Sequence, residues 1–128
     1  MIQRNIPIGW IKKIISSENY LVADISYVFC TDEYLLELNE KFLGHKTYTD
    51  IISFDYSEGN RISGEIYIST DRVKENAQRY NVDFDIELKR VMAHGLLHLV
   101  GYKDKTEEDE KVMRAKEDEK IDMFHVKQ

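Results

Sequence analysis

Hydrophobic residues recur along this chain at two spacings, one typical of strands and one typical of helices. Alternation of apolar and polar positions predicts three strands, over residues 21–30, 51–56 and 62–69. Apolar residues three or four positions apart predict four helices, and a charged segment is expected to form a fifth. These helices run from Gly9 to Ser16, from a cap at Thr31 or Asp32 to Gly44, from a Thr70 cap to Tyr80, from an Asp83 cap to Gly101, and from Thr106 to Lys120.

Two of these elements have a defined apolar side. The strand over residues 21–30 is expected to turn one set of side chains inward, namely Leu21, Ala23, Ile25, Tyr27 and Phe29. The next helix has an apolar side formed by Leu35, Leu38 and Phe42. Residues 57–60, Ser-Glu-Gly-Asn, are typical of a turn and predict an antiparallel hairpin between the second and third strands.

The helix after Asp83 is apolar over most of its circumference, which is typical of a helix buried at the centre of a protein. Strands mixed with helices predict an α/β (α+β) fold, in which helices cover a small mixed sheet. The chain has 128 residues, one proline and no internal repeats, so we expect a single domain over residues 1–128.

The composition narrows the range of functions. The chain holds 24 acidic and 18 basic residues, a formal net charge of −6. This balance argues against a general nucleic-acid coat protein or a membrane-surface binder, both of which need a basic face, but it does not exclude an enzyme that meets nucleic acid at one local site. More than half of the acidic excess lies in residues 104–122, a pattern typical of a solvated helix face.

The cellular compartment follows from what the sequence lacks. Cys30 is the only cysteine, so an internal disulfide is excluded and a reducing compartment is expected. No apolar run approaches the length of a membrane span, and residues 1–5 lack the apolar stretch of a secretion signal. We therefore expect a cytoplasmic protein that does not bind membranes.

The candidate chemistry lies on the central helix. His94 and His98 are four residues apart, which places both rings on one helix face. Asp104 follows a turn at Gly101, where the chain can return across the helix end. Two imidazoles and a carboxylate suit zinc and similar ions, and three protein ligands leave a position open for water. A histidine pair at this spacing also arises by chance, but two histidines on an apolar helix are costly to bury unless they are paired.

The residue after the first histidine bears on the reaction. Zinc proteases with this spacing carry a glutamate there as general base, whereas this chain has Gly95, so peptide hydrolysis of that type is disfavoured. Gly95 is instead expected to leave an open helix face beside the metal. A two-histidine, one-carboxylate set also permits an iron oxygenase.

The motifs together resemble the YbeY endoribonuclease family. Residues 94–102, His-Gly-Leu-Leu-His-Leu-Val-Gly-Tyr, are similar to its signature. Residues 49–54, Thr-Asp-Ile-Ile-Ser-Phe, and residues 63–69, Ser-Gly-Glu-Ile-Tyr-Ile-Ser, resemble its strand motifs, and Leu38-Asn39 resembles its helix motif. These matches keep their order and spacing over about residues 38–104.

The chain departs from the family at two positions. Asp104 stands where the family usually has a third histidine, preceded here by Lys103, so the resemblance assigns His94 and His98 as ligands and Asp104 by position and chemistry. Leu43 stands where the family generally has an arginine expected to hold the scissile phosphate. The nearby candidates for that role are His45, Lys46 and Arg61.

The resemblance implies a single-strand-specific, metal-dependent endoribonuclease of 16S rRNA 3′-end maturation and ribosome quality control. It implies one divalent ion, with zinc favoured, and as partners single-stranded rRNA and the ribosome or its small subunit. Candidates for stacking on unpaired bases are Tyr48, Tyr56 and Tyr102. RNA is expected on the side of Lys41, Lys46 and Arg61, away from the acidic residues 107–110. The non-enzymatic alternative is a ribosome-assembly factor whose metal only holds the C-terminal segment.

Overall fold

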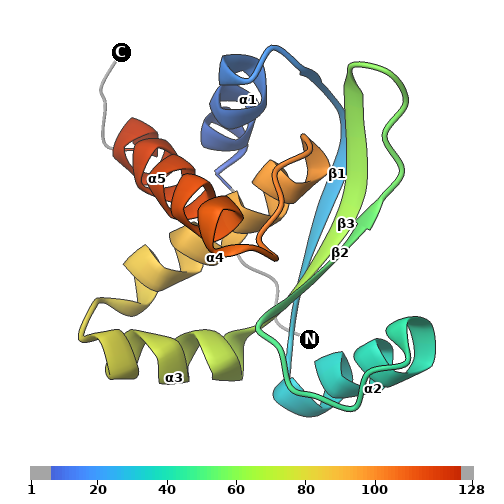
Figure 1. Ribbon diagram of the computed structural model, residues 1–128, viewed down its shortest axis with the longest axis vertical. Helices are drawn as coiled ribbons and strands as arrows, with labels where there is room; N and C mark the ends of the chain where they lie inside the picture. Colours follow the sequence, from blue (N-terminus) through green and yellow to red (C-terminus); the bar gives the residue numbers. More distant parts are fainter. Residues whose placement is uncertain (1–6, 125–128) are drawn as a thin grey trace.

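The computed structural model describes residues 7–124, and its elements follow the predicted order (Figure 1). Within that range the strands are β1 (Leu21–Cys30), β2 (Ile51–Asp55) and β3 (Arg61–Ser69). The helices are α1 (Ile8–Ser17), α2 (Asp32–Leu43), α3 (Thr70–Tyr80), α4 (Phe84–Leu99) and α5 (Glu107–Phe124). Each predicted element is confirmed with small shifts of its ends, whereas residues 1–5, which entered the argument on secretion, lie outside the described residues.

The three strands form one mixed sheet in the order β1-β3-β2. β1 lies parallel to the central strand β3, and β2 lies antiparallel to it. The hairpin predicted from residues 57–60 is confirmed, with Ile51 opposite Ile68 and Asp55 opposite Gly64. The α+β fold with a small mixed sheet is therefore confirmed.

The predicted alternation of β1 holds only in part. Tyr27 and Phe29 are buried, but Leu21 is 55% exposed and Ala23 is also exposed. The register against β3 shifts between Val22 and Asp24. Such a bulge exchanges the two faces of the strand for the residues that precede it, so Val22 rather than Leu21 packs on the core.

α4 is the central helix of the layer that covers one face of the sheet (Figure 1). It packs against β2 and β3 and also contacts α1, α3 and α5. Its buried apolar residues lie around most of its circumference: Leu88, Val91, Met92, Ala93, Leu96, Leu97 and Leu99. The prediction of a central buried helix is confirmed.

Gly95 lies on the sheet side of α4, and this corrects the expectation of an open helix face. A Cβ atom at Gly95 would lie 2.9 Å from both Ile51 Cδ1 and Ile66 Cγ2. The missing side chain thus allows α4 to approach the sheet closely. His94 and His98 project from a helix whose distance from the sheet is set by this contact.

The opposite face of the sheet is partly covered by α2. Leu35 is fully buried there, whereas Phe42, predicted on the same apolar side, is 56% exposed and packs edge-on against Phe54. α2 begins at Thr31, whose hydroxyl accepts a hydrogen bond from the backbone of Tyr34, and it ends at Gly44, which has φ 71°.

Two predicted caps differ from the structure. The hydroxyl of Ser69, rather than that of Thr70, accepts the backbone N–H of Arg72 at the start of α3. Asp83 precedes α4 as predicted but makes no side-chain cap hydrogen bond. The cap of α3 thus lies one residue earlier than predicted, and the cap of α4 lies at the predicted residue without the expected side-chain hydrogen bond.

α5 is only in part the solvated face that its charge predicts. Its first residues are acidic and mostly exposed, but four side chains farther along are buried, namely Met113, Glu117, Lys120 and Ile121. These residues face α4 and α1 across the core. None of the helices within residues 7–124 combines the length and apolar character needed to cross a membrane.

Candidate metal centre

The three side chains predicted as ligands converge on one point. Nε2 of His94 and Nε2 of His98 lie 3.0 Å apart. Oδ2 of Asp104 lies 3.1 Å from His94 Nε2 and 3.3 Å from His98 Nε2. The two histidines occupy consecutive turns of α4, and Gly101, with φ 105°, turns the chain so that Asp104 comes back to them.

The dimensions of this triangle fit a small divalent ion. Tetrahedral zinc has bonds of about 2.0–2.1 Å to nitrogen and oxygen, which places two ligand atoms about 3.3 Å apart. The edges between His94, His98 and Asp104 are 3.0–3.3 Å. Among residues 7–124, His94, His98 and Asp104 are the histidine, cysteine or acidic side chains whose ligand atoms lie close enough together to hold one metal ion. A tetrahedral ion bound by these three ligands would keep a fourth coordination position for solvent or substrate.

In both histidine rings the Nδ1 atom, which points away from the candidate metal position, has a hydrogen-bond acceptor. These hydrogen bonds orient the Nε2 atoms toward that position. Nδ1 of His98 lies 2.9 Å from the backbone oxygen of Tyr102, a group that can only accept, so Nδ1 carries the proton. Nδ1 of His94 lies 2.6 Å from Oε2 of Glu117. Both Nε2 lone pairs therefore point toward Asp104, as ligation of one shared ion requires.

Protonation of His94 competes with metal binding at this site. Burial has the largest effect on the pKa of His94 and lowers it, but the hydrogen bond and charge of Glu117, with Asp104 and Asp50, raise it by more. The pKa of His94 is therefore above its ordinary value. Because a ligating imidazole must be neutral at Nε2, metal affinity at this site should rise with pH.

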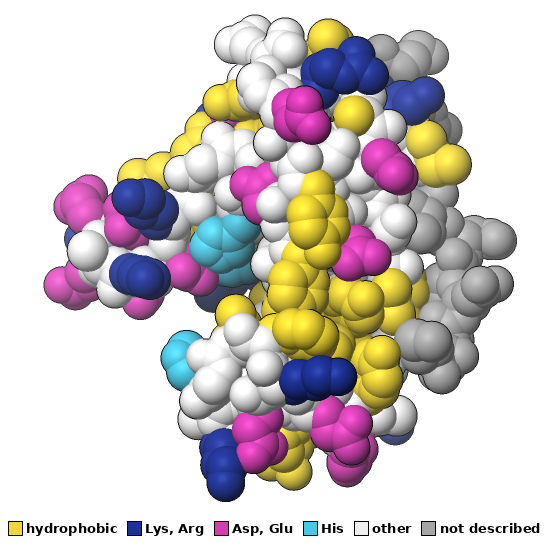
Figure 2. Space-filling model, turned by 90° about the vertical axis from the view of Figure 1, so that its right-hand side faces the viewer, with side chains coloured by type: hydrophobic (Ala, Val, Ile, Leu, Met, Phe, Trp, Pro, Cys, Tyr) yellow, Lys and Arg dark blue, Asp and Glu magenta, His cyan; other side chains and the backbone are white. Residues whose placement is uncertain are grey.

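A cleft of about 760 Å³ opens beside the ligands, between α4 and the edge strand β2 (Figure 2). His94, His98 and Asp104 line one side. The other side is formed by the end of α2, the loop that follows it and β2, including Leu43, His45, Tyr48, Asp50, Ser53 and Asp55. Lys105 lines the cleft next to Asp104.

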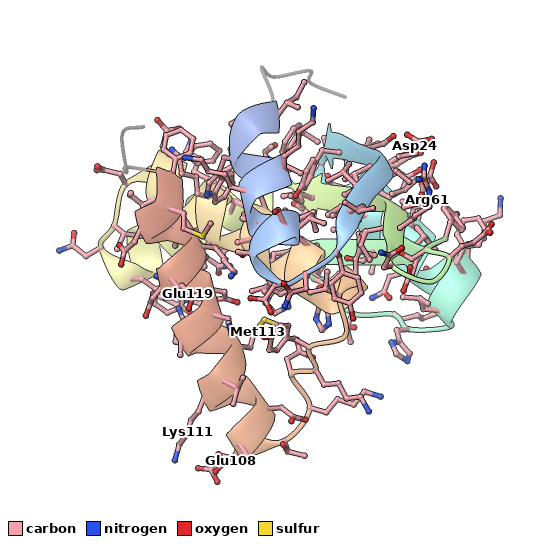
Figure 3. The ribbon with its side chains drawn as sticks, turned by 90° about the horizontal axis from the view of Figure 1, so that it is seen from above. Asp24, Arg61, Glu108, Lys111, Met113 and Glu119 are labelled. Atoms are coloured by element: carbon pink, nitrogen blue, oxygen red, sulfur yellow. The ribbon has the colours of Figure 1, made fainter. Side chains whose placement is uncertain are left out.

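Only some of the other candidate residues predicted from the sequence lie at the cleft. Among the three candidates for holding the phosphate, His45 lines the cleft but Lys46 and Arg61 do not. Lys46 pairs with Glu40 at 3.5 Å, and Arg61 lies beside Asp24 on the side of the molecule opposite the start of α5 (Figure 3).

The three tyrosines considered for base stacking also differ in whether they line the cleft. Tyr48 is 53% exposed and lines the cleft, whereas Tyr56 is exposed outside it and donates to Glu65. Tyr102 packs against the core and donates its hydroxyl to Glu18 at 2.7 Å. Of the stacking candidates, only Tyr48 faces the cleft.

Sequence reasoning overlooked two groups at the site. Glu117 was counted within an acidic run, although its spacing from Met113 and Ile121 places it on the same inward stripe of α5. Asp50 enters the sequence analysis only within the motif of residues 49–54, yet it lines the cleft, and desolvation, the largest influence, raises its pKa. A count of inward positions in α5 finds Glu117, while nothing local in the sequence indicates that Asp50 lines the cleft.

The fold and the three convergent side chains define a small α+β protein with a candidate mononuclear metal centre on a buried helix. The chain belongs to the endoribonuclease YbeY family, whose sequence model matches residues 5–125. The family resemblance read from the motifs is thereby confirmed.

Individual relatives agree with this assignment. The chain is 59% identical over 120 residues to the endoribonuclease YbeY of Christiangramia forsetii, covering 94% of this chain and 84% of the relative. It is 58% identical to that of Flavobacterium psychrophilum, covering 94% and 86%. The solution structure of TM1509 from Thermotoga maritima superposes with a TM-score of 0.66 at 30% identity, covering 90% of this chain and 76% of that one.

Proposed function

We propose that this protein is a metal-dependent endoribonuclease that cleaves single-stranded RNA. The observation that carries the proposal is the convergence of His94, His98 and Asp104, with both outer ring nitrogens already hydrogen-bonded, beside an open cleft. Membership of the endoribonuclease YbeY family supports RNA as the substrate.

The donor set favours zinc as the ion. The chemistry that such an ion supplies when bound is Lewis-acid activation of water and of a phosphoryl oxygen. The carboxylate of Asp104 lowers the net charge of a divalent site from +2 to +1, compared with a site of neutral ligands. We therefore expect a less acidic bound water than three histidines would give, and more tolerance of harder ions.

The cleft would hold the RNA strand and orient its phosphate. Lys105 can contribute positive charge near the phosphate, His45 can contribute a hydrogen bond, and exposed Tyr48 offers a face on which an unpaired base can stack. Residues 107–110 add negative charge at the start of α5, on the other side of Asp104. RNA would thus approach over β2 and the loop before it, with little non-specific affinity elsewhere.

We further propose that the RNA is ribosomal, that cleavage serves 16S rRNA 3′-end maturation and ribosome quality control, and that the small ribosomal subunit is the cytoplasmic partner. These details follow from the family resemblance. A comparison of cleavage on free rRNA precursor and on immature small subunits would test the partner.

The function itself is tested by incubating the purified chain with matched single-stranded and duplex RNA, after chelation and after zinc is restored. We expect cleavage of the single strand only, lost on chelation, recovered with zinc and absent in His98→Ala. Oxygen consumption with iron and no RNA cleavage would instead indicate an oxygenase. Unfolding on chelation without any cleavage would indicate a purely structural metal.

A further inference from the structure

The imidazole of His94 is held from behind by a buried carboxylate of α5. Oε2 of Glu117 lies 2.6 Å from His94 Nδ1, and the Glu117 side chain is 7% exposed. Its second oxygen, Oε1, lies 3.2 Å from Nη1 of Arg90 on α4. Both oxygens of Glu117 thus have partners, one on each side, and the carboxylate has little freedom to rotate.

The two histidines are supported by groups of different kinds. His98 donates to the neutral backbone oxygen of Tyr102, which comes from the same helix end. His94 faces a carboxylate that lies 23 residues away in sequence. A carboxylate withdraws the Nδ1 proton more strongly than a carbonyl and so makes the opposite nitrogen a stronger donor to a metal.

A structural ion pair alone does not account for Glu117. Arg90 has a shorter contact with Asp118, 2.8 Å from its Nη2, and that pair would hold α4 to α5 without Glu117. Burying a glutamate is costly unless its oxygens are used, and the shorter of its two bonds is to the histidine. The geometry is that of a carboxylate–histidine pair aimed at a metal.

We propose that Glu117 is a positioning residue of the metal centre: it fixes the His94 ring with Nε2 toward the ion and strengthens that ligand, while Arg90 holds Glu117 in place. This inference rests on the metal centre of the proposed function. It makes α5 part of the site, because removal of its carboxylate leaves His94 free to rotate or to exchange its proton between the ring nitrogens.

The test measures zinc affinity of the full chain by competition with a chromogenic chelator, for the wild type, Glu117→Ala and Glu117→Gln. Glu108→Gln is the matched control, because Glu108 is an exposed acid near the start of the same helix (Figure 3). Proton NMR of the zinc-loaded protein follows the Nδ1 proton of His94, which a short bond to a carboxylate should place far downfield.

We expect Glu117→Ala to bind zinc roughly 10- to 100-fold more weakly and to lose the downfield proton. Glu117→Gln keeps an acceptor without the charge, so its affinity should be intermediate and the proton should move upfield. Glu108→Gln should match the wild type in both measurements. Thermal unfolding without zinc separates these effects from loss of fold, and if Glu117→Ala does not fold, Glu117→Gln decides.

Wild-type zinc affinity and an unmoved proton signal in a folded Glu117 variant would overturn the proposal. An equal loss in Glu108→Gln would also overturn it, since helix charge would then explain the effect. If the wild type itself bound no zinc, the metal centre and the proposed function would fail together. RNA cleavage by the wild type combined with unchanged affinity in Glu117→Ala would overturn only the role of Glu117.

Discussion

The ammonium group of Lys120 lies 2.7 Å from Oε2 of Glu18, and the lysine side chain has no exposed surface. Its other contacts are 2.8 Å to Ser17 Oγ and 2.6 Å to Glu119 Oε2, so each of its three protons has an acceptor. The backbone oxygen of Lys120 accepts from the indole of Trp10 at 2.7 Å. α5 is thus fastened to both ends of α1, and this contact keeps Glu117 against the metal centre.

Replacing Lys120 by methionine should destabilise the protein substantially. The substitution leaves Ser17 Oγ without its donor and removes the shortest cation contact of Glu18, which keeps Lys116 and Tyr102 as partners. Breaking a buried ion pair in this way typically costs about 3 kcal/mol or more. Urea unfolding followed by Trp10 fluorescence measures the loss. Lys111→Met, at an exposed position of α5, should change the free energy of unfolding little; equal effects would show that the buried pair adds nothing.

Acid should weaken the same contact. Burial has the largest effect on the pKa of Glu18 and raises it, but the hydrogen bonds of Lys120, Tyr102 and Lys116 outweigh it and lower the pKa from 4.5 to about 2. The stabilisation is therefore complete above pH 4.5 and is lost as the pH falls toward 2. Unfolding free energies of the wild type should drop more steeply between pH 6 and pH 3 than those of Glu18→Gln, and parallel profiles would contradict this.

The sequence predicts the order of the elements because most of them have a recognisable apolar spacing and are separated by turn or capping residues. It also predicted His94, His98 and Asp104, since the first two are fixed by helix geometry and the third by one turn at Gly101. Sequence spacing could not show contacts between distant segments. Glu117 and His94, which are hydrogen-bonded, are 23 residues apart in sequence, and the ion-paired residues Lys120 and Glu18 are 102 residues apart.

Two local errors have the same origin. Gly95 was interpreted as an opening on the helix, because the sequence does not show that the sheet lies 2.9 Å from its missing Cβ. Leu21 is expected inside, because a strand pattern does not reveal the bulge between Val22 and Asp24. In both positions a neighbouring element, rather than the local pattern, decides which side chain is buried.

Adding a methyl group at Gly95 should disturb both the fold and the site. In Gly95→Ala the new Cβ must displace Ile51 and Ile66, which should cost about 1–3 kcal/mol and shift His94 relative to Asp104. Gly9→Ala is the control, since among residues 7–124 no atom outside its own helix turn lies within 4 Å of its added Cβ, and alanine favours the helix. We expect lower stability and weaker zinc binding only in Gly95→Ala; wild-type values there would mean that the sheet yields without strain.

Loss of the cleft lysine should reduce RNA cleavage. Lys105 lines the cleft beside Asp104, whereas Lys46 and Arg61 lie outside it. A charged contact to phosphate is worth about 1.5 kcal/mol or more, so Lys105→Gln should lower kcat/KM on single-stranded RNA at least roughly tenfold. Lys46→Gln and Arg61→Gln should stay near the wild type. Greater losses in these two variants would place the RNA along a different path.

The identity of the third ligand can be tested by two substitutions at Asp104. Asp104→Ala removes an oxygen that lies 3.1 Å and 3.3 Å from the two histidine nitrogens, so zinc affinity should fall by about 100-fold or more. Asp104→His supplies a neutral donor instead and raises the net charge of the loaded site from +1 to +2. The water ligand should then be more acidic, and the rise of cleavage rate with pH should move to lower pH.

Metal content by mass spectrometry, chelator competition and a pH–rate profile measure these effects. Unchanged tight zinc binding in Asp104→Ala would remove Asp104 from the ligand set, and an unshifted profile in Asp104→His would show that the charge of this ligand does not control the reaction.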